Sequence, residues 1–153
     1  MRLLKAVTGI LAIAALVGAL AAAGSGANTS VTRLTLDGVP FHPELALTSA
    51  SRVRGLMNRR KAPADGMLFV YRRDTTGGFW MKDTLVPLTI VLFTADGKRV
   101  RRLSMKPCRS DPCPIYSPGR TYRFALELRA SDARPAKRLG PPWELRRLSR
   151  IAS

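Results

Sequence analysis

The stretch PLTIVLFTADGKRVRRL, residues 87–103, decides the fold. Its first arm, from Leu88 to Phe93, is a nearly continuous apolar run, which is the pattern of a strand buried on both faces. Asp96 and Gly97 follow, and an Asp-Gly pair between two arms is typical of a tight hairpin turn. The stretch therefore predicts a β-hairpin with one arm inside the core.

Further strands are predicted around this hairpin. GMLFVY predicts a strand from Met67 to Tyr71, followed by a turn from Arg72 to Gly78, and GGFWMKDT predicts a strand over residues 77–84. TYRFALEL alternates between two faces, as a half-buried strand does. Its apolar face holds Tyr122, Phe124, Leu126 and Leu128, and its polar face holds Arg123, Ala125 and Glu127.

LTLDGVPF, residues 34–41, predicts another hairpin, which turns at Asp37-Gly38. The proline in its second arm indicates an edge strand, because proline has no backbone N–H to donate. The pairs expected across the turn, the first two on one face, are Leu36–Val39, Leu34–Phe41 and Thr35–Pro40.

Helical segments are few. TSASRVRGLMNRR predicts a helix capped by Thr48 or Ser49, with an apolar stripe formed by Val53, Leu56 and Met57. A short helix is expected around Ala133–Leu139, and a last strand over Trp143–Leu148. The inventory predicts an α+β fold, mostly β, with a curved antiparallel sheet or small barrel and one or two short helices.

The N-terminus has the pattern of a secretory signal peptide. Arg2 and Lys5 precede an uncharged run of 18 residues, Ala6–Ala23, and small residues continue to Ala27. We therefore expect a signal peptide over residues 1–27, a single domain over residues 28–153, and export to the periplasm or the extracellular space. The alternative is an uncleaved membrane anchor, because the uncharged run is just long enough to span a bilayer.

The charge is strongly positive. The whole chain carries +16, and removal of residues 1–27 takes away two cations and no acid, which leaves +14. In an exported protein this charge favours an anionic envelope component as partner. An arginine-rich composition alone gives the same charge, however, and the cations are scattered. No basic cluster carries the interleaved aromatic residues of a single-strand groove, so no nucleic-acid partner is expected.

Cys108 and Cys113 lie in PCRSDPCPIYSPG. In an exported chain, two cysteines predict a structural disulfide. Their spacing and the nearby prolines disfavour a redox role, and with His42 as the only histidine they are too few for a structural zinc site. Soft sulfur ligands for Cu(I) are conceivable, but methionine commonly fills irregular cores, so we predict no metal and no cofactor. The methionines concerned are Met57, Met67, Met81 and Met105.

A series of motifs occurs in a specific order: GLM, GMLF, FWMK, MKPC, CPIYSPG and LEL. In this combination the chain resembles the domain of unknown function 192 family from about Val31 to Leu148. The resemblance implies a small, mostly β, often exported protein with no established activity. The chain departs from the family pattern at Asp83, where Asn is usual, at Thr89, where Asp is usual, and at Arg129-Ala130, where Ala-Gly is usual.

The FWMK motif raises the question of a site. On a strand, Phe79 and Met81 would face one way and Trp80 and Lys82 the other. A buried Lys82 would need a partner, for which Glu127 is the candidate. The ordinary interpretation is a solvated rim or a structural ion pair. The functional one is a small pocket that binds an anionic or sugar ligand, formed by Arg54, Trp80, Lys82 and Glu127.

Catalytic signatures are weak. The sequence has no Ser-His-Asp order, no nucleophile elbow and no glycine-rich phosphate loop. We therefore predict an exported binding module for a small or anionic envelope ligand. The alternative is an envelope hydrolase that uses Asp83 or Glu127 as its acid-base group. A convergent pocket around an acid with a raised pKa would favour the enzyme, and an open basic face would favour binding.

Overall fold

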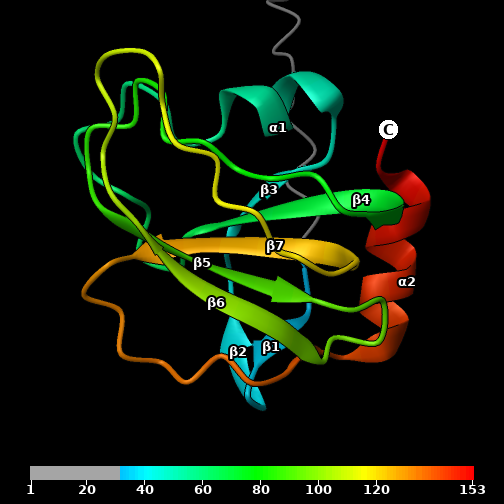
Figure 1. Ribbon diagram of the computed structural model, residues 1–153. Coiled ribbons are helices and arrows are strands. Elements are labelled where there is room, and N and C mark those ends of the chain that lie inside the picture. Colours follow the sequence, from blue (N-terminus) through cyan, green and yellow to red (C-terminus); the bar gives the residue numbers. More distant parts are fainter. Residues whose placement is uncertain (1–31) are drawn as a thin grey trace, which may run out of the picture. The chain divides into compact units, whose positions relative to one another are not determined.

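The computed structural model describes residues 32–153 of the chain (Figure 1). The predicted signal peptide and its cleavage point lie outside these residues and stay a prediction. The described part is mostly β, as predicted, with two short helices and two open sheets and no closed barrel. The strands of the first sheet are β1 (Leu34–Leu36), β2 (Val39–Phe41) and β8 (Leu139–Gly140), in the order β2-β1-β8.

The second sheet has five strands in the order β3-β4-β7-β5-β6. All neighbours in it are antiparallel except β3 and β4, which are parallel. The two helices are α1 (Ser49–Arg54) and α2 (Pro142–Ile151). The strands are β3 (Glu44–Ala46), β4 (Met67–Thr75), β5 (Leu88–Phe93), β6 (Arg99–Met105) and β7 (Tyr122–Arg129).

The predicted central hairpin is confirmed. Every residue of β5 is buried, and β5 pairs with β6 on one side and with β7 on the other. Each face of the five-stranded sheet therefore carries its own apolar core. One core joins β7 residues such as Leu126 to α2 and the three-stranded sheet. The other lies between Ala125 of β7 and the segments around α1 and the cysteine loop.

The N-terminal hairpin has the predicted register, with Leu34 opposite Phe41 and Leu36 opposite Val39. The left-handed backbone of Asp37 and Gly38 makes its turn. Val39 is nevertheless exposed, although Leu36 opposite it is buried in the core.

Helix α1 is shorter than predicted. Thr48 caps it through a reciprocal pair of hydrogen bonds with Ser51, and Gly55, at φ 45°, ends it. The predicted apolar stripe is wrong in consequence. Val53 is exposed, and Leu56 is buried from the turn that follows the helix.

Two C-terminal predictions are also wrong. Residues 133–137 are irregular rather than helical, because Pro135 interrupts the backbone pattern and Ala136 has a positive φ. The predicted strand Trp143–Leu148 is instead part of α2, which begins with a proline in its first turn. Leu145 and Leu148, three residues apart, are the core residues of this helix.

The segment from residue 72 to residue 84 differs as well. Strand β4 runs on to Thr75, so the predicted turn from Arg72 begins later. Residues 77–84 form no regular strand. They are held by isolated bridges from Phe79 to Tyr116 and from Lys82 and Thr84 to Cys108.

The predicted disulfide between Cys108 and Cys113 is present. Its loop supports the FWMK segment through the backbone. The Cys108 N–H donates to the Met81 carbonyl at 3.2 Å, and the Asp83 N–H donates to the Cys108 carbonyl at 3.0 Å. The disulfide indicates a non-cytoplasmic environment. Across residues 32–153, none of the helices has the length and apolarity to cross a bilayer.

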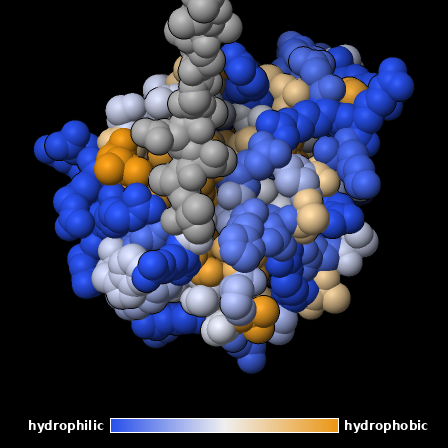
Figure 2. Space-filling view, turned by 180° about the vertical axis from the view of Figure 1, so that it is seen from behind, coloured by the Kyte–Doolittle hydropathy of each residue, from blue (hydrophilic) through white to orange (hydrophobic). Residues whose placement is uncertain are grey.

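The surface opposite the view of Figure 1 is mainly hydrophilic. In Figure 2, the visible hydrophobic residues form small separate patches among hydrophilic ones. Scattered apolar residues are normal on a soluble surface. The hollows of the surface are therefore more informative than its apolar patches.

Replacing both cysteines by serine, Cys108→Ser with Cys113→Ser, should lower the free energy of unfolding by about 2 kcal/mol, because the bridge closes only a short loop. Urea unfolding of the oxidised parent and of the variant measures the difference. A stability equal to that of the parent would contradict a structural role for the bridge.

Candidate functional site

Glu127 is a buried carboxyl group at the centre of the five-stranded sheet. It lies on β7, opposite Met67 of β4 and Ile90 of β5, and is 5% exposed. Its Oε2 atom has no hydrogen-bond partner within residues 32–153. Burial raises the pKa of this carboxyl from 4.5 to about 8, because the charged form is poorly solvated there. At neutral pH Glu127 is therefore mainly protonated and can donate a hydrogen bond.

The burial of Glu127 corrects the prediction of a polar face on β7. Ala125 and Glu127 are both buried on that face, which a second core covers. An acid in a strand with a buried neighbour on each side is unusual, since unpaired carboxyl groups are costly inside a protein. Such positions are commonly functional.

A small cavity of about 40 Å³ lies against Glu127. It brings together three of the four predicted site residues, Arg54, Trp80 and Glu127. Glu127 is its only carboxyl-bearing lining residue among those described. A volume of this size accommodates a water molecule or one small polar group. The remaining lining residues are Arg52, Val53, Gly55, Leu56, Met57, Phe69, Phe79 and Thr84.

A larger and more open groove of about 350 Å³ adjoins this cavity. The two share Arg52, Val53, Phe79 and Trp80 as lining residues. We call them the Glu127 cavity and the outer groove. The outer groove is completed by Ser49, Tyr71 and Gly78.

Aromatic rings form part of the lining of both spaces. Phe79 packs edge-on against Phe69 at 5.8 Å, and Tyr71 packs edge-on against Tyr122 at 5.5 Å. Trp80 is 48% exposed, so part of its ring is open to solvent. The inward positions of Phe79 and Met81 and the outward position of Trp80 follow the predicted alternation, although the segment is not a strand.

The two arginines of α1 differ in their freedom. Arg52 donates from Nη1 to the carbonyls of Leu47 and Val70 and from Nη2 to that of Ser153, and it lies 5.0 Å above the Tyr71 ring. These bonds fix its guanidinium as part of the wall. Arg54 is exposed and forms no ion pair with a carboxylate in residues 32–153. Arg54 is therefore available to a ligand.

The predicted pairing of Lys82 with Glu127 is wrong. The Lys82 Nζ lies 2.5 Å from Oδ2 of Asp111, and this hydrogen bond raises the lysine pKa. Lys82 lines neither the Glu127 cavity nor the outer groove. Asp83, the other acid considered for catalysis, lines neither space, and its backbone is held in a left-handed conformation between Asn58 and Cys108.

Sequence reasoning missed Arg52 and Tyr71. Tyr71 had a signal, because the two-residue period of β4 places it on the same face as Met67 and Phe69. No pattern in the sequence indicates the role of Arg52, since it depends on the carbonyls of Val70 and Ser153, which are distant in the sequence.

The model of one protein family, DUF192, described as an uncharacterized ACR, matches residues 32–137. A solved structure from Sinorhizobium meliloti, described as that of a candidate transcription regulator, is similar with a TM-score of 0.60 and 28% identity over 71% of this chain and 90% of that chain. A protein of unknown function from Novosphingobium aromaticivorans has a TM-score of 0.57 and 23% identity over 66% of this chain and 75% of that chain. No curated protein matches the chain.

Glu127→Gln should change how stability depends on pH. The parent's folded state holds a proton on Glu127 up to a pKa of about 8, whereas the unfolded chain releases it near 4.5. The parent's free energy of unfolding therefore falls as pH rises between these values, by roughly 1.4 kcal/mol for each pH unit. The Gln variant has no such proton to lose.

Urea unfolding of parent and variant at pH 5 and pH 8.5 tests this expectation. The stability of the Gln variant relative to the parent should rise by several kcal/mol from the lower to the higher pH. A difference between the two proteins that stays constant over this range would show that Glu127 titrates normally.

Proposed function

The chain belongs to the DUF192 family of uncharacterised proteins, and from that premise we propose that it is an exported domain that binds a small molecule in the Glu127 cavity and the outer groove. The observation that carries the proposal is the buried Glu127 carboxyl, whose Oε2 atom has no partner in the described residues. A ligand group that hydrogen-bonds there would remove the cost of an unsatisfied polar atom.

The lining residues favour a particular ligand chemistry. The protonated Glu127 can donate a hydrogen bond to a hydroxyl or carbonyl oxygen in a space that fits one small polar group. The partly open Trp80 ring offers a stacking face for a sugar or another flat ring. Arg54, at the edge, can bind a carboxylate or phosphate. A small sugar acid satisfies all three features.

Export is proposed on two observations. The N-terminal pattern of cations, uncharged run and small residues is that of a secretory signal. The Cys108–Cys113 disulfide suits an oxidising compartment. An envelope location would expose the site to the carbohydrates and anionic groups of the cell surface.

Acid-base catalysis is the second candidate function. A carboxyl pKa of about 8 suits a general acid that must be protonated at neutral pH. Hydrolysis of a glycoside normally needs a pair of carboxyl groups across the substrate. The Glu127 cavity has the acid with a raised pKa that would favour an enzyme. Glu127 is nevertheless the only carboxyl group among the described lining residues of both spaces, so the second group of the pair is missing there and binding has the stronger support.

Ligand binding can be followed through tryptophan fluorescence. The chain has two tryptophans, Trp80 and Trp143, so Trp143→Phe leaves Trp80 as the only reporter. Titration of this variant with glucuronate should change its emission, and glucose should bind more weakly because it lacks the anionic group. Adding Glu127→Leu, which removes both hydrogen-bonding oxygens, should weaken binding at least tenfold, the equivalent of about 1.4 kcal/mol.

A matched pair of variants separates specific from general effects. Trp80 and Trp143 are 48% and 47% exposed, and only Trp80 lines the site. In calorimetric titrations, Trp80→Ala should abolish glucuronate binding and Trp143→Ala should leave it intact. Equal effects of the two substitutions, or no binding to the parent at millimolar concentrations, would refute the assignment of a sugar-acid ligand.

Cleavage of the signal segment can be read directly. N-terminal sequencing of protein isolated from the envelope or the medium should find a first residue between Gly24 and Asn28, since the small-residue exit of the apolar run lies there. An intact Met1 in the membrane fraction would establish the anchor instead.

A further inference from the structure

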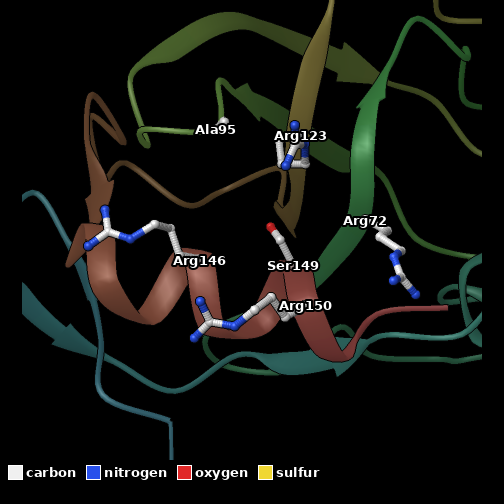
Figure 3. Close-up of a pocket in the computed structure, with 6 residues that line it drawn as sticks. All are labelled: Arg72, Ala95, Arg123, Arg146, Ser149 and Arg150. Atoms are coloured by element: carbon white, nitrogen blue, oxygen red, sulfur yellow. The ribbon is translucent and has the colours of Figure 1, made fainter.

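A second hollow, unrelated to the Glu127 site, lies where α2 packs against the five-stranded sheet. Its volume is about 530 Å³, and it shares no lining residue with the Glu127 cavity or the outer groove. Four of its six lining residues are arginines, and none carries a carboxyl group. They are Arg72, Ala95, Arg123, Arg146, Ser149 and Arg150 (Figure 3).

Three different parts of the fold supply these arginines. Arg72 comes from β4, Arg123 from β7, and Arg146 and Arg150 from α2. In Figure 3 the Ser149 hydroxyl points toward Arg123, while the side chains of Arg146 and Arg150 extend outward on one side of this pair and that of Arg72 on the other. The floor of the hollow therefore has one hydroxyl and one guanidinium, and its edge has three separated positive groups.

The positive charges in this hollow are largely uncompensated. The Arg123 Nε donates to Asp74 at 2.8 Å, which neutralises one arginine in part. Arg72, Arg146 and Arg150 are exposed and form no ion pair with a carboxylate in residues 32–153. Arg146 and Arg150 are four residues apart on one helix, an arrangement of like charges that destabilises a helix slightly. An anion bound between these side chains would remove that repulsion.

We infer that this arginine hollow binds a ligand with at least two phosphate charges. Guanidinium groups bind phosphate oxygens through paired N–H donors, and the Ser149 hydroxyl can add a further hydrogen bond. The wide spacing of the rim arginines suits a diphosphate or a phosphorylated body better than one isolated phosphate. The volume lies within the range of small-ligand sites.

Such phosphate groups have two sources, a soluble phosphate ester and the headgroup of an anionic phospholipid. The lipid source has a structural argument of its own, because Trp143 and Ile151 on α2 are both about half exposed. Tryptophan beside arginine is common where a protein meets a membrane surface. The experiment therefore includes both sources.

The test uses the protein as isolated from the producing cells, at constant ionic strength, because salt screens exposed charges. Calorimetry measures the binding of pyrophosphate, and co-sedimentation measures the binding of vesicles that contain cardiolipin, whose headgroup has two phosphates, against phosphatidylcholine vesicles. The test variants are the double substitution Arg146→Gln with Arg150→Gln and the single substitution Arg72→Gln. The control, Arg109→Gln with Arg120→Gln, removes the same charge as the double variant from exposed positions outside the hollow.

The expected result is binding of at least one phosphate probe, weakened at least tenfold more by the α2 double substitution than by the control. Arg72→Gln should weaken it in the same direction, and Trp80→Ala should leave it unchanged. Binding to pyrophosphate would identify a soluble ester as the source, and binding confined to vesicles would identify the lipid headgroup. Failure to bind either probe, a smaller difference between the double variants, or tighter binding of duplex DNA than of both probes would overturn the inference.

Discussion

The structure depends on the position of β7, which is hydrogen-bonded to β4 on one side and to β5 on the other. A strand so placed must be covered on both faces, and the chain provides two cores for this purpose. Glu127 is buried because it belongs to this strand. Its raised pKa follows from this burial, and its Oε2 atom, which has no partner in residues 32–153, lies against a small cavity.

The wall opposite Glu127 is built differently. The segment that holds Phe79, Trp80 and Met81 has only isolated bridges, and it is supported by the backbone of the cysteine loop. The Cys108–Cys113 disulfide therefore has a structural role: its loop supports the segment that carries Phe79 and Trp80. Glu127 thus lies on a regular strand of the central sheet, whereas Trp80 lies in an irregular segment.

The main sheet could be predicted because its signals are local. The apolar run of β5 and the Asp-Gly turns determine their own conformation. The strand period around FWMK and on β7 also singled out Trp80 and Glu127, which line one cavity with Arg54. The failures have a common cause in tertiary contacts. Leu145 and Leu148 are compatible with a strand or a helix until the core that receives them is known. Lys82 pairs with Asp111 because the cysteine loop folds back over it, which no pattern around either residue indicates.

The raised pKa of Glu127 also makes the protonation of the site sensitive to the surrounding pH. In the proposed location outside the cytoplasm, the site would meet the acidity of the medium, which no cytoplasmic buffer controls. A ligand that accepts the Glu127 proton in a hydrogen bond competes with ionisation of that group, so its affinity falls by up to about tenfold for each pH unit above the pKa of about 8. Occupancy of the site would then report external alkalinity as well as ligand concentration.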